Sequence, residues 1–178
     1  MRLECRFSLV LAALLLLYGG GRPAAARITI GDAVPAIKLP NWEGKPVDLA
    51  DLKGKVVVID FWASWCAVCR QALPSVDAIS RHFAGAPVAV IGINIDQTPS
   101  LADHFLADYL PVRSMMLLRD PEAEALARFG AEGMPAIYVV DSRGIVRFAE
   151  SGYRPERLTA VENAVTQYLP QASHGGPQ

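Results

Sequence analysis

Two cysteines, Cys66 and Cys69, lie three positions apart where the chain changes from a strand pattern to a helix pattern. A β-branched apolar run, residues 56–62, precedes them, and apolar residues at helical spacing follow. At the start of a helix, backbone N–H groups and the positive end of the helix dipole both stabilise a thiolate. This arrangement predicts thiol–disulfide exchange chemistry.

The third cysteine, Cys5, belongs to an N-terminal segment with the layout of a secretory signal peptide. Two arginines lie before or at the start of an apolar run over residues 7–18, and small residues at 24–26 resemble a cleavage site. The run is shorter than the about 20 residues that cross a bilayer. We therefore predict a signal peptide over residues 1–26 and export to the periplasm. An uncleaved membrane anchor through residues 7–21 is the alternative.

Removal of the signal would leave one cysteine pair, whereas secreted disulfide frameworks usually carry four or more cysteines. The pair therefore indicates redox chemistry or metal binding. The formal net charge is −1, and no basic patch with interleaved aromatic residues occurs, so we expect no nucleic-acid partner. The remaining length suits one domain, residues 27–169, and the polar end 170–178 is predicted to be a disordered tail.

The pattern of apolar residues and turn residues gives the expected elements. Strands are predicted near 37–39, 47–49, 56–62, 88–93, 115–118, 136–140 and 145–149. Helices are predicted over 66–83, with a kink at Pro74, from 99 to about 109, over 122–129 and over 158–169. In the helix that begins at Pro99, the expected apolar face is Leu101, Phe105, Leu106 and Tyr109. This order of elements predicts an α/β domain with a central mixed sheet flanked by helices on both faces.

Four segments together resemble the thioredoxin superfamily, and within it the exported TlpA-like branch. Residues 31–55 resemble the N-terminal β-hairpin of that branch, and residues 57–69 its active-site strand and loop. Residues 96–120 occupy the place of its central helical insertion, and residues 133–140 resemble its cis-proline loop and following strand. The resemblance implies a thioredoxin fold and a redox-active disulfide between Cys66 and Cys69.

The chain departs from the family pattern at three positions. Ala67–Val68 separates the cysteines, without the proline that often precedes the second one. Ala72 stands where some cytochrome-maturation reductases of the branch carry a buried glutamate, and Asp60 matches the buried aspartate of ordinary thioredoxins. The first two departures leave the physiological partner open, and the third favours a thioredoxin-like proton path.

Each cysteine has a different expected role. Cys66, at the helix start, is the predicted nucleophile, because only a thiolate attacks a disulfide, and Cys69 is the predicted resolving cysteine. Asp60 is the candidate for proton transfer to and from Cys69, since burial raises the pKa of a carboxyl group. A strand-end acid satisfied by backbone or water is the alternative for Asp60.

The resemblance also implies a substrate-binding surface. It makes Pro135 a cis-proline that exposes the backbone of Met134 for pairing with an extended substrate segment. Of Trp62 and Trp65, it places Trp65 at the surface beside the thiols, with packing as the alternative to a substrate role. The three histidines share no spacing with the cysteines and the pair Met115–Met116 is expected in the core, so we predict no metal ligands and no cofactor.

The leading functional hypothesis is an enzyme that reduces protein disulfides outside the cytoplasm, supplied with electrons by a membrane donor that the resemblance implies. Cytochrome c maturation is its most specific form, and general repair of wrongly oxidised proteins is close to it. A disulfide oxidant or isomerase would use the same residues, because the direction depends on reduction potential. A copper-binding thiol module lacks a nearby histidine or methionine cluster, and a peroxiredoxin would need Pro-x-x-x-Thr-x-x-Cys where this chain has Ser64 and Trp65 before Cys66. We expect protein substrates and a monomer.

Overall fold

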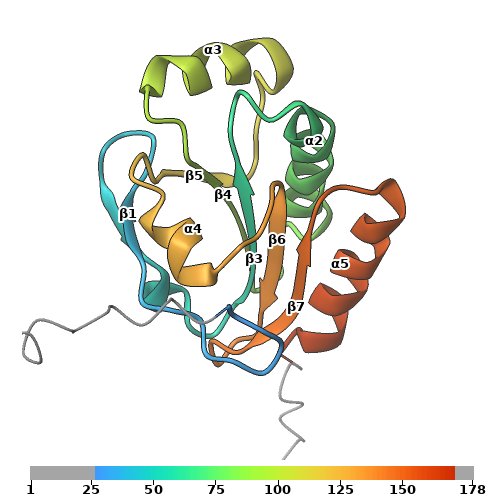
Figure 1. Cartoon of the computed structure of the whole chain (residues 1–178). Helices are drawn as coiled ribbons and strands as arrows, with labels where there is room; N and C mark the ends of the chain where they lie inside the picture. Colours follow the sequence, from blue (N-terminus) through green and yellow to red (C-terminus); the bar gives the residue numbers. More distant parts are fainter. Residues whose placement is uncertain (1–26, 171–178) are drawn as a thin grey trace, which may run out of the picture.

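The computed structural model describes residues 27–170, so the predicted signal peptide and all but the first residue of the predicted tail lie outside the described residues. Figure 1 shows a central sheet with helices on both faces. The strands are β1 Lys38–Pro40, β2 Pro46–Asp48, β3 Val56–Trp62, β4 Val88–Asn94, β5 Met116–Arg119, β6 Ala136–Val140 and β7 Val146–Ser151. The helices are η1 Leu49–Leu52, α2 Ala67–His82, α3 Pro99–Tyr109, α4 Glu124–Phe129 and α5 Pro155–Tyr168.

The five-stranded sheet has the order β5-β4-β3-β6-β7, with β3 at its centre. β3 pairs in parallel with β4 and antiparallel with β6, so the predicted mixed sheet is confirmed. All seven residues of β3 are buried, as expected of a strand that is apolar except for Asp60. A strand held on both edges and both faces gives the segment that follows it a fixed starting point.

The two faces of the sheet carry different helices. α2 and α5 cover one face, and α4 with the β1–β2 hairpin lies on the other, as Figure 1 shows. On the hairpin side Phe61 meets Phe129 of α4 with ring centroids 5.2 Å apart. On the α2 side Leu73, Val76 and Ile79 of α2 are buried, and so are Val161 and Val165 of α5, as predicted.

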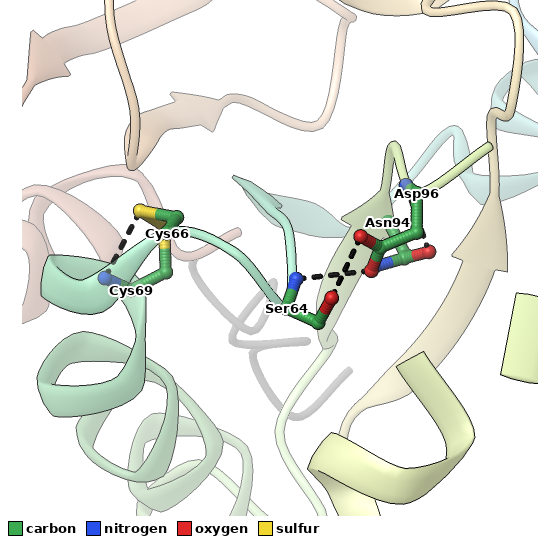
Figure 2. The surroundings of a disulfide bond; sticks show 5 residues. All are labelled: Ser64, Cys66, Cys69, Asn94 and Asp96. Carbon is green, nitrogen blue, oxygen red and sulfur yellow. Dashed lines mark hydrogen bonds between the residues drawn. A yellow bond between two sulfur atoms is a disulfide. The ribbon is translucent and has the colours of Figure 1, made fainter. Parts of the chain in front are cut away.

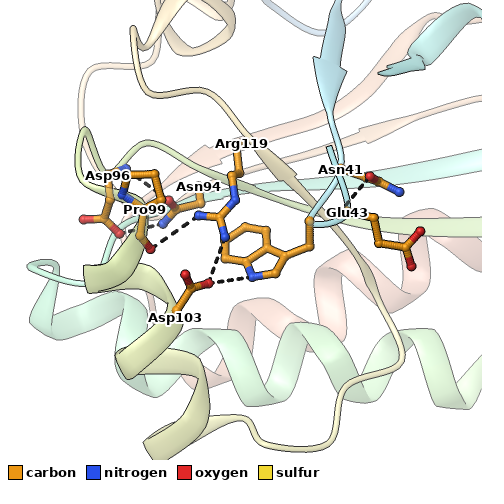
Figure 3. Close-up of polar contacts among 8 residues, drawn as sticks. Asn41, Glu43, Asn94, Asp96, Pro99, Asp103 and Arg119 are labelled. Carbon is orange, nitrogen blue, oxygen red and sulfur yellow. Dashed lines mark hydrogen bonds and ion pairs between the residues drawn. The ribbon is translucent and has the colours of Figure 1, made fainter. Parts of the chain in front are cut away.

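Side-chain contacts connect the β1–β2 hairpin to the insertion helix α3 beside the sheet. The guanidinium carbon of Arg119 lies 3.5 Å from the ring centroid of Trp42, and both side chains donate hydrogen bonds of 2.8 Å to Oδ1 of Asp103. Figure 3 shows Asp103 on α3 facing Arg119. Trp42 in turn stacks on Trp62, with ring centroids 6.3 Å apart, so the hairpin packs on the strand that leads to the cysteines.

Some predicted element boundaries and faces were wrong. Leu101 and Tyr109 of α3 are 51% and 43% exposed, because α3 packs through the narrower stripe Ala102, Phe105 and Leu106. Met115 is buried as expected, but Met116 is exposed. α5 begins three residues early, with Pro155 in its first turn, where proline is well tolerated.

Two helices differ from expectation in detail. α2 runs from Ala67 to His82, one residue inside the predicted bounds at each end, with Pro74 inside it. α4 starts at Glu124 rather than residue 122, because the carboxylate of Asp120 accepts hydrogen bonds from the N–H groups of the first three residues of this helix. Within residues 27–170, no helix combines the length and the apolar character needed to cross a membrane.

Candidate active site

The cysteines follow directly from the end of β3. The N–H of Cys66 donates a hydrogen bond of 3.1 Å to the carbonyl of Ala63, which closes a tight turn with Ser64 and Trp65 at its centre. Cys66 then occupies the N-cap position of α2, with extended backbone, and its Sγ accepts a hydrogen bond of 3.2 Å from the N–H of Cys69. The sulfur thus takes the place that a serine or aspartate oxygen usually takes at a helix start.

Cys66 and Cys69 form a disulfide, with their Cα atoms 5.2 Å apart (Figure 2). Cys66 retains 8% exposure, and Cys69 has none. The first turn of α2 contains no acidic residue, so no carboxylate there opposes a negative charge on the Cys66 sulfur. The geometry favours Cys66 as the sulfur that a partner reaches.

Asp60 lies on β3, on the face that α2 and α5 cover, and it is 1% exposed. Neither carboxylate oxygen has a hydrogen-bond partner among the described residues. Burial raises the pKa of Asp60 from 3.8 to about 8, because the ionised form is poorly solvated there. The alternative for Asp60 was an acid that accepts hydrogen bonds from backbone groups or water. Its backbone part is wrong, since no backbone donor reaches the carboxylate.

A small cavity adjoins Asp60. Its walls include Ala72 of α2, Pro135, Ile137 of β6 and Glu150 of β7, and its volume is about 20 Å³. A cavity of this size holds about one water molecule, provided that polar groups line it. Ala72, 2% exposed, leaves room where a longer side chain would fill the space. The surroundings of Asp60 therefore suit proton exchange better than a sealed apolar core would.

A wider groove lies beside Cys66. It is lined by Trp65, Cys66, Ile95, Leu126 and residues 131–134, around a space of about 430 Å³. Trp65 is 67% exposed and Trp62 is fully buried, which agrees with the placement that the resemblance implied. The walls are mostly apolar, so the groove suits an extended segment with apolar side chains.

The loop across the groove has the expected backbone. The Met134–Pro135 peptide bond is cis, and the carbonyl of Pro135 accepts a hydrogen bond of 2.7 Å from Gly152. Pro135 is buried and Met134 is half-buried. The structure thus brings Met134 and Trp65 to the same groove as Cys66.

Two buried polar residues close to the cysteines, Asn94 and Asp96, were not predicted from the sequence. Asp96, two residues after the end of β4, accepts hydrogen bonds from both the N–H and the hydroxyl of Ser64, two residues before Cys66. The available signal was topological, because the carboxyl ends of parallel strands meet at one edge of a sheet, where sites form.

His82 and His104 are exposed, and His174 lies outside the described residues. Across residues 27–170, no group of three or more histidine, cysteine or acidic residues could hold a metal ion.

Comparison with known proteins assigns the family. The model of the AhpC/TSA family matches residues 30–149, so the chain belongs to this family, and its resemblance to the TlpA-like branch of the thioredoxin superfamily is confirmed. The thiol-disulfide oxidoreductase ResA of Bacillus subtilis (strain 168) is 25% identical over 142 residues, which cover 80% of this chain and 75% of ResA. The thiol:disulfide interchange protein DsbE of Pseudomonas fluorescens biotype C is 30% identical over 119 residues, 66% of this chain and 64% of DsbE.

Solved structures of thiol–disulfide exchange proteins are also similar to this chain. A Chlorobium tepidum protein classed as a thiol:disulfide interchange protein DsbE has a TM-score of 0.75 and 31% identity, with 80% of this chain and 99% of that chain covered. The thioredoxin domain of a thiol-disulfide oxidoreductase from Bacteroides vulgatus has a TM-score of 0.68 and 25% identity, with 80% and 99% covered. The predicted thioredoxin fold and the prediction of a thiol–disulfide oxidoreductase are confirmed.

Asp60 generates a prediction about stability. Its pKa of about 8 in the folded protein exceeds the ordinary 3.8, so the unfolded chain ionises it first as the pH rises. The folded state therefore loses stability between about pH 4 and 8, relative to a protein without this acid, by on the order of 4 kcal/mol at pH 7. We expect Asp60→Asn to be more stable than the wild type at pH 7, with a gain that disappears near pH 4. Urea denaturation of both oxidised proteins from pH 4 to 8 measures it, and a gain independent of pH would contradict the raised pKa.

Proposed function

We propose that this thiol–disulfide oxidoreductase works outside the cytoplasm and reduces disulfides in other proteins. The observation that carries the proposal is the sulfur of Cys66 at the N-cap of α2, beside an apolar groove. The relatives named ResA and DsbE, and the signal-like residues 1–26, support it. The specific reaction that we propose is the reduction of haem-attachment cysteines during cytochrome c maturation.

In the first step, the Cys66 thiolate attacks one sulfur of a substrate disulfide. The substrate S–S bond breaks, a Cys66–substrate disulfide forms, and the other substrate sulfur leaves as a thiolate that takes a proton. The N–H of Cys69 and the dipole of α2 stabilise the attacking anion, since both lie at the helix start.

In the second step, Cys69 loses its proton and attacks Cys66. The Cys66–substrate bond breaks, the substrate leaves fully reduced, and the Cys66–Cys69 disulfide forms. Cys69 is fully buried, so its proton needs an internal acceptor. We assign that role to Asp60, whose pKa of about 8 lets it both accept and release a proton near neutrality. Two electrons from a membrane donor then restore the dithiol.

The groove supplies recognition. We propose that a substrate segment lies between Trp65 and residues 131–134 and pairs with the backbone of Met134 as an added strand. Met134, which precedes the cis bond to Pro135, lines this groove. We propose a monomer, since one chain supplies every residue named here.

The division of labour between the cysteines predicts a trapped intermediate. In Cys69→Ser, Cys66 can still attack, but nothing resolves the mixed disulfide, so the variant should accumulate a covalent complex with a disulfide-bonded substrate protein. Non-reducing electrophoresis and mass spectrometry detect that complex. Cys66→Ser serves as the matched control and should form none. A complex through Cys69 in the control would reverse the assignment.

The proton role of Asp60 predicts a change in turnover. In Asp60→Asn, release of substrate from Cys66 should slow by about 10-fold or more near pH 7, because general acid–base steps contribute about 10²–10⁴-fold. Stopped-flow measurement of the resolving step from pH 5 to 9 reports it. If the variant keeps the pH profile of the wild type, Asp60 has no part in proton transfer.

Direction is tested by the reduction potential of the Cys66–Cys69 pair. A reductant is expected near the thioredoxin value of about −270 mV, whereas an oxidant lies near −120 mV. Equilibration with glutathione or dithiothreitol buffers gives the value. A potential near that of the oxidant would favour the alternative, a disulfide oxidant or isomerase that uses the same residues.

A further inference from the structure

A buried carboxylate holds the turn that precedes the cysteines. Asp96 is 3% exposed, and its Oδ2 accepts a hydrogen bond of 2.9 Å from the N–H of Ser64, while its Oδ1 accepts one of 2.8 Å from the Ser64 hydroxyl. Asn94, which is 1% exposed, donates a third bond of 2.7 Å to Oδ2 and accepts one of 3.2 Å from the N–H of Asp96. Figure 2 shows this network beside the disulfide, on the far side of the turn.

The network acts on the middle of the turn. Ser64 and Trp65 are the central residues between Ala63 and Cys66, and the N–H of the first central residue takes no part in the hydrogen bond that closes the turn. Asp96 satisfies that N–H and also fixes the Ser64 side chain. The orientation of the turn, and with it the direction in which the exposed Trp65 projects, therefore depends on Asp96.

The same network adjoins two residues that line the groove. Trp65 follows Ser64, and Ile95 lies between Asn94 and Asp96, and both Trp65 and Ile95 line the groove beside Cys66. Cys66 has independent support, since it caps α2 through Sγ and its carbonyl accepts a hydrogen bond of 3.4 Å from Arg70. Loss of Asp96 should thus disturb the positions of Trp65 and Ile95 more than that of Cys66.

We propose that Asp96 is a positioning residue that holds Trp65 and Ile95 in the lining of the protein-substrate groove, and so determines affinity for protein disulfides. This inference rests on the proposed function, because it concerns the groove used there. It assigns to a buried acid a role in selecting extended protein segments over small disulfides, which need only the sulfur of Cys66.

The chain offers a matched set of variants. In Asp96→Asn, the amide oxygen can replace Oδ2 and accept the bonds from Ser64 N–H and Asn94, and the amide nitrogen can donate to the Ser64 hydroxyl. This variant removes the charge and keeps the network. Asp96→Ala removes both and leaves buried donors unpaired, and Ser64→Ala removes the hydroxyl bond alone.

The experiment compares reduction of a protein disulfide, insulin, with reduction of a small one, oxidised glutathione. Asp96→Ala should raise KM for insulin about five- to tenfold, as loss of an interface anchor does, and leave kcat/KM for glutathione within about twofold. Asp96→Asn should stay within about twofold of the wild type on both substrates. Ser64→Ala should raise KM for insulin about two- to threefold, and this result decides the matter if Asp96→Ala does not fold.

A double-mutant cycle with Trp65→Ala tests the route. If Asp96 acts through Trp65, Asp96→Ala combined with Trp65→Ala should bind insulin no more than about twofold more weakly than Trp65→Ala alone. Equal loss on both substrates, additive effects in the cycle, or an unchanged KM in Trp65→Ala beside a raised one in Asp96→Ala would each overturn the proposal. Failure of the proposed function would look different, since it would show in the wild type itself, as a reduction potential near that of an oxidant or as no reduction of either substrate.

Discussion

The chemistry of this protein depends on where a buried strand stops. β3 is buried along its whole length, and within four residues of its end the chain enters α2 with the sulfur of Cys66 at the helix N-cap. Backbone N–H groups at a helix start have no partner within the helix, so they stabilise an anion placed there. Because β3 is paired on both edges, the sulfur is held at that point by the whole sheet rather than by a flexible loop.

One buried residue of β3 lowers the stability of the folded protein. Asp60 keeps both oxygens without a hydrogen-bond partner among the described residues, in a core that would be better filled by an apolar side chain. Asp96, in contrast, is a buried acid whose oxygens accept three hydrogen bonds. Two buried carboxylates, one on β3 and one just after β4, thus differ in their hydrogen bonding. Asp96 suits a role in positioning because its oxygens accept hydrogen bonds, and Asp60 suits proton exchange because burial raises its pKa to about 8.

The parts of the fold that followed from sequence are those with a strong local pattern. The strands Val56–Trp62 and Ala136–Val140 were predicted with their observed bounds, because both are runs of apolar residues, interrupted only by Asp60 in the first. The face of α3 was predicted less well, since a helix at the end of a sheet buries a narrow stripe that its neighbours define. Leu101 and Tyr109 fit the helical period but remain 51% and 43% exposed.

The residues of the site also differ in how far local sequence predicts them. The spacing of Cys66 and Cys69 pointed to redox chemistry directly, whereas the cis bond before Pro135 came only from resemblance, because local sequence does not determine it. The contact between Ser64 and Asp96 joins two loops 32 positions apart, and no periodic signal marks such a pair. Tertiary structure alone brings these residues together.

The most direct test of this account is the pKa of the Cys66 thiol in the reduced protein. Rates of alkylation by iodoacetamide from pH 4 to 10, with the labelled peptides identified by mass spectrometry, give a value for each cysteine. We predict that Cys66 reacts first, with a pKa lowered below that of a free thiol by the N–H groups and dipole at the start of α2, and that buried Cys69 stays protected. A Cys66 pKa at or above the unperturbed value of about 8.5, or faster labelling of Cys69, would contradict it.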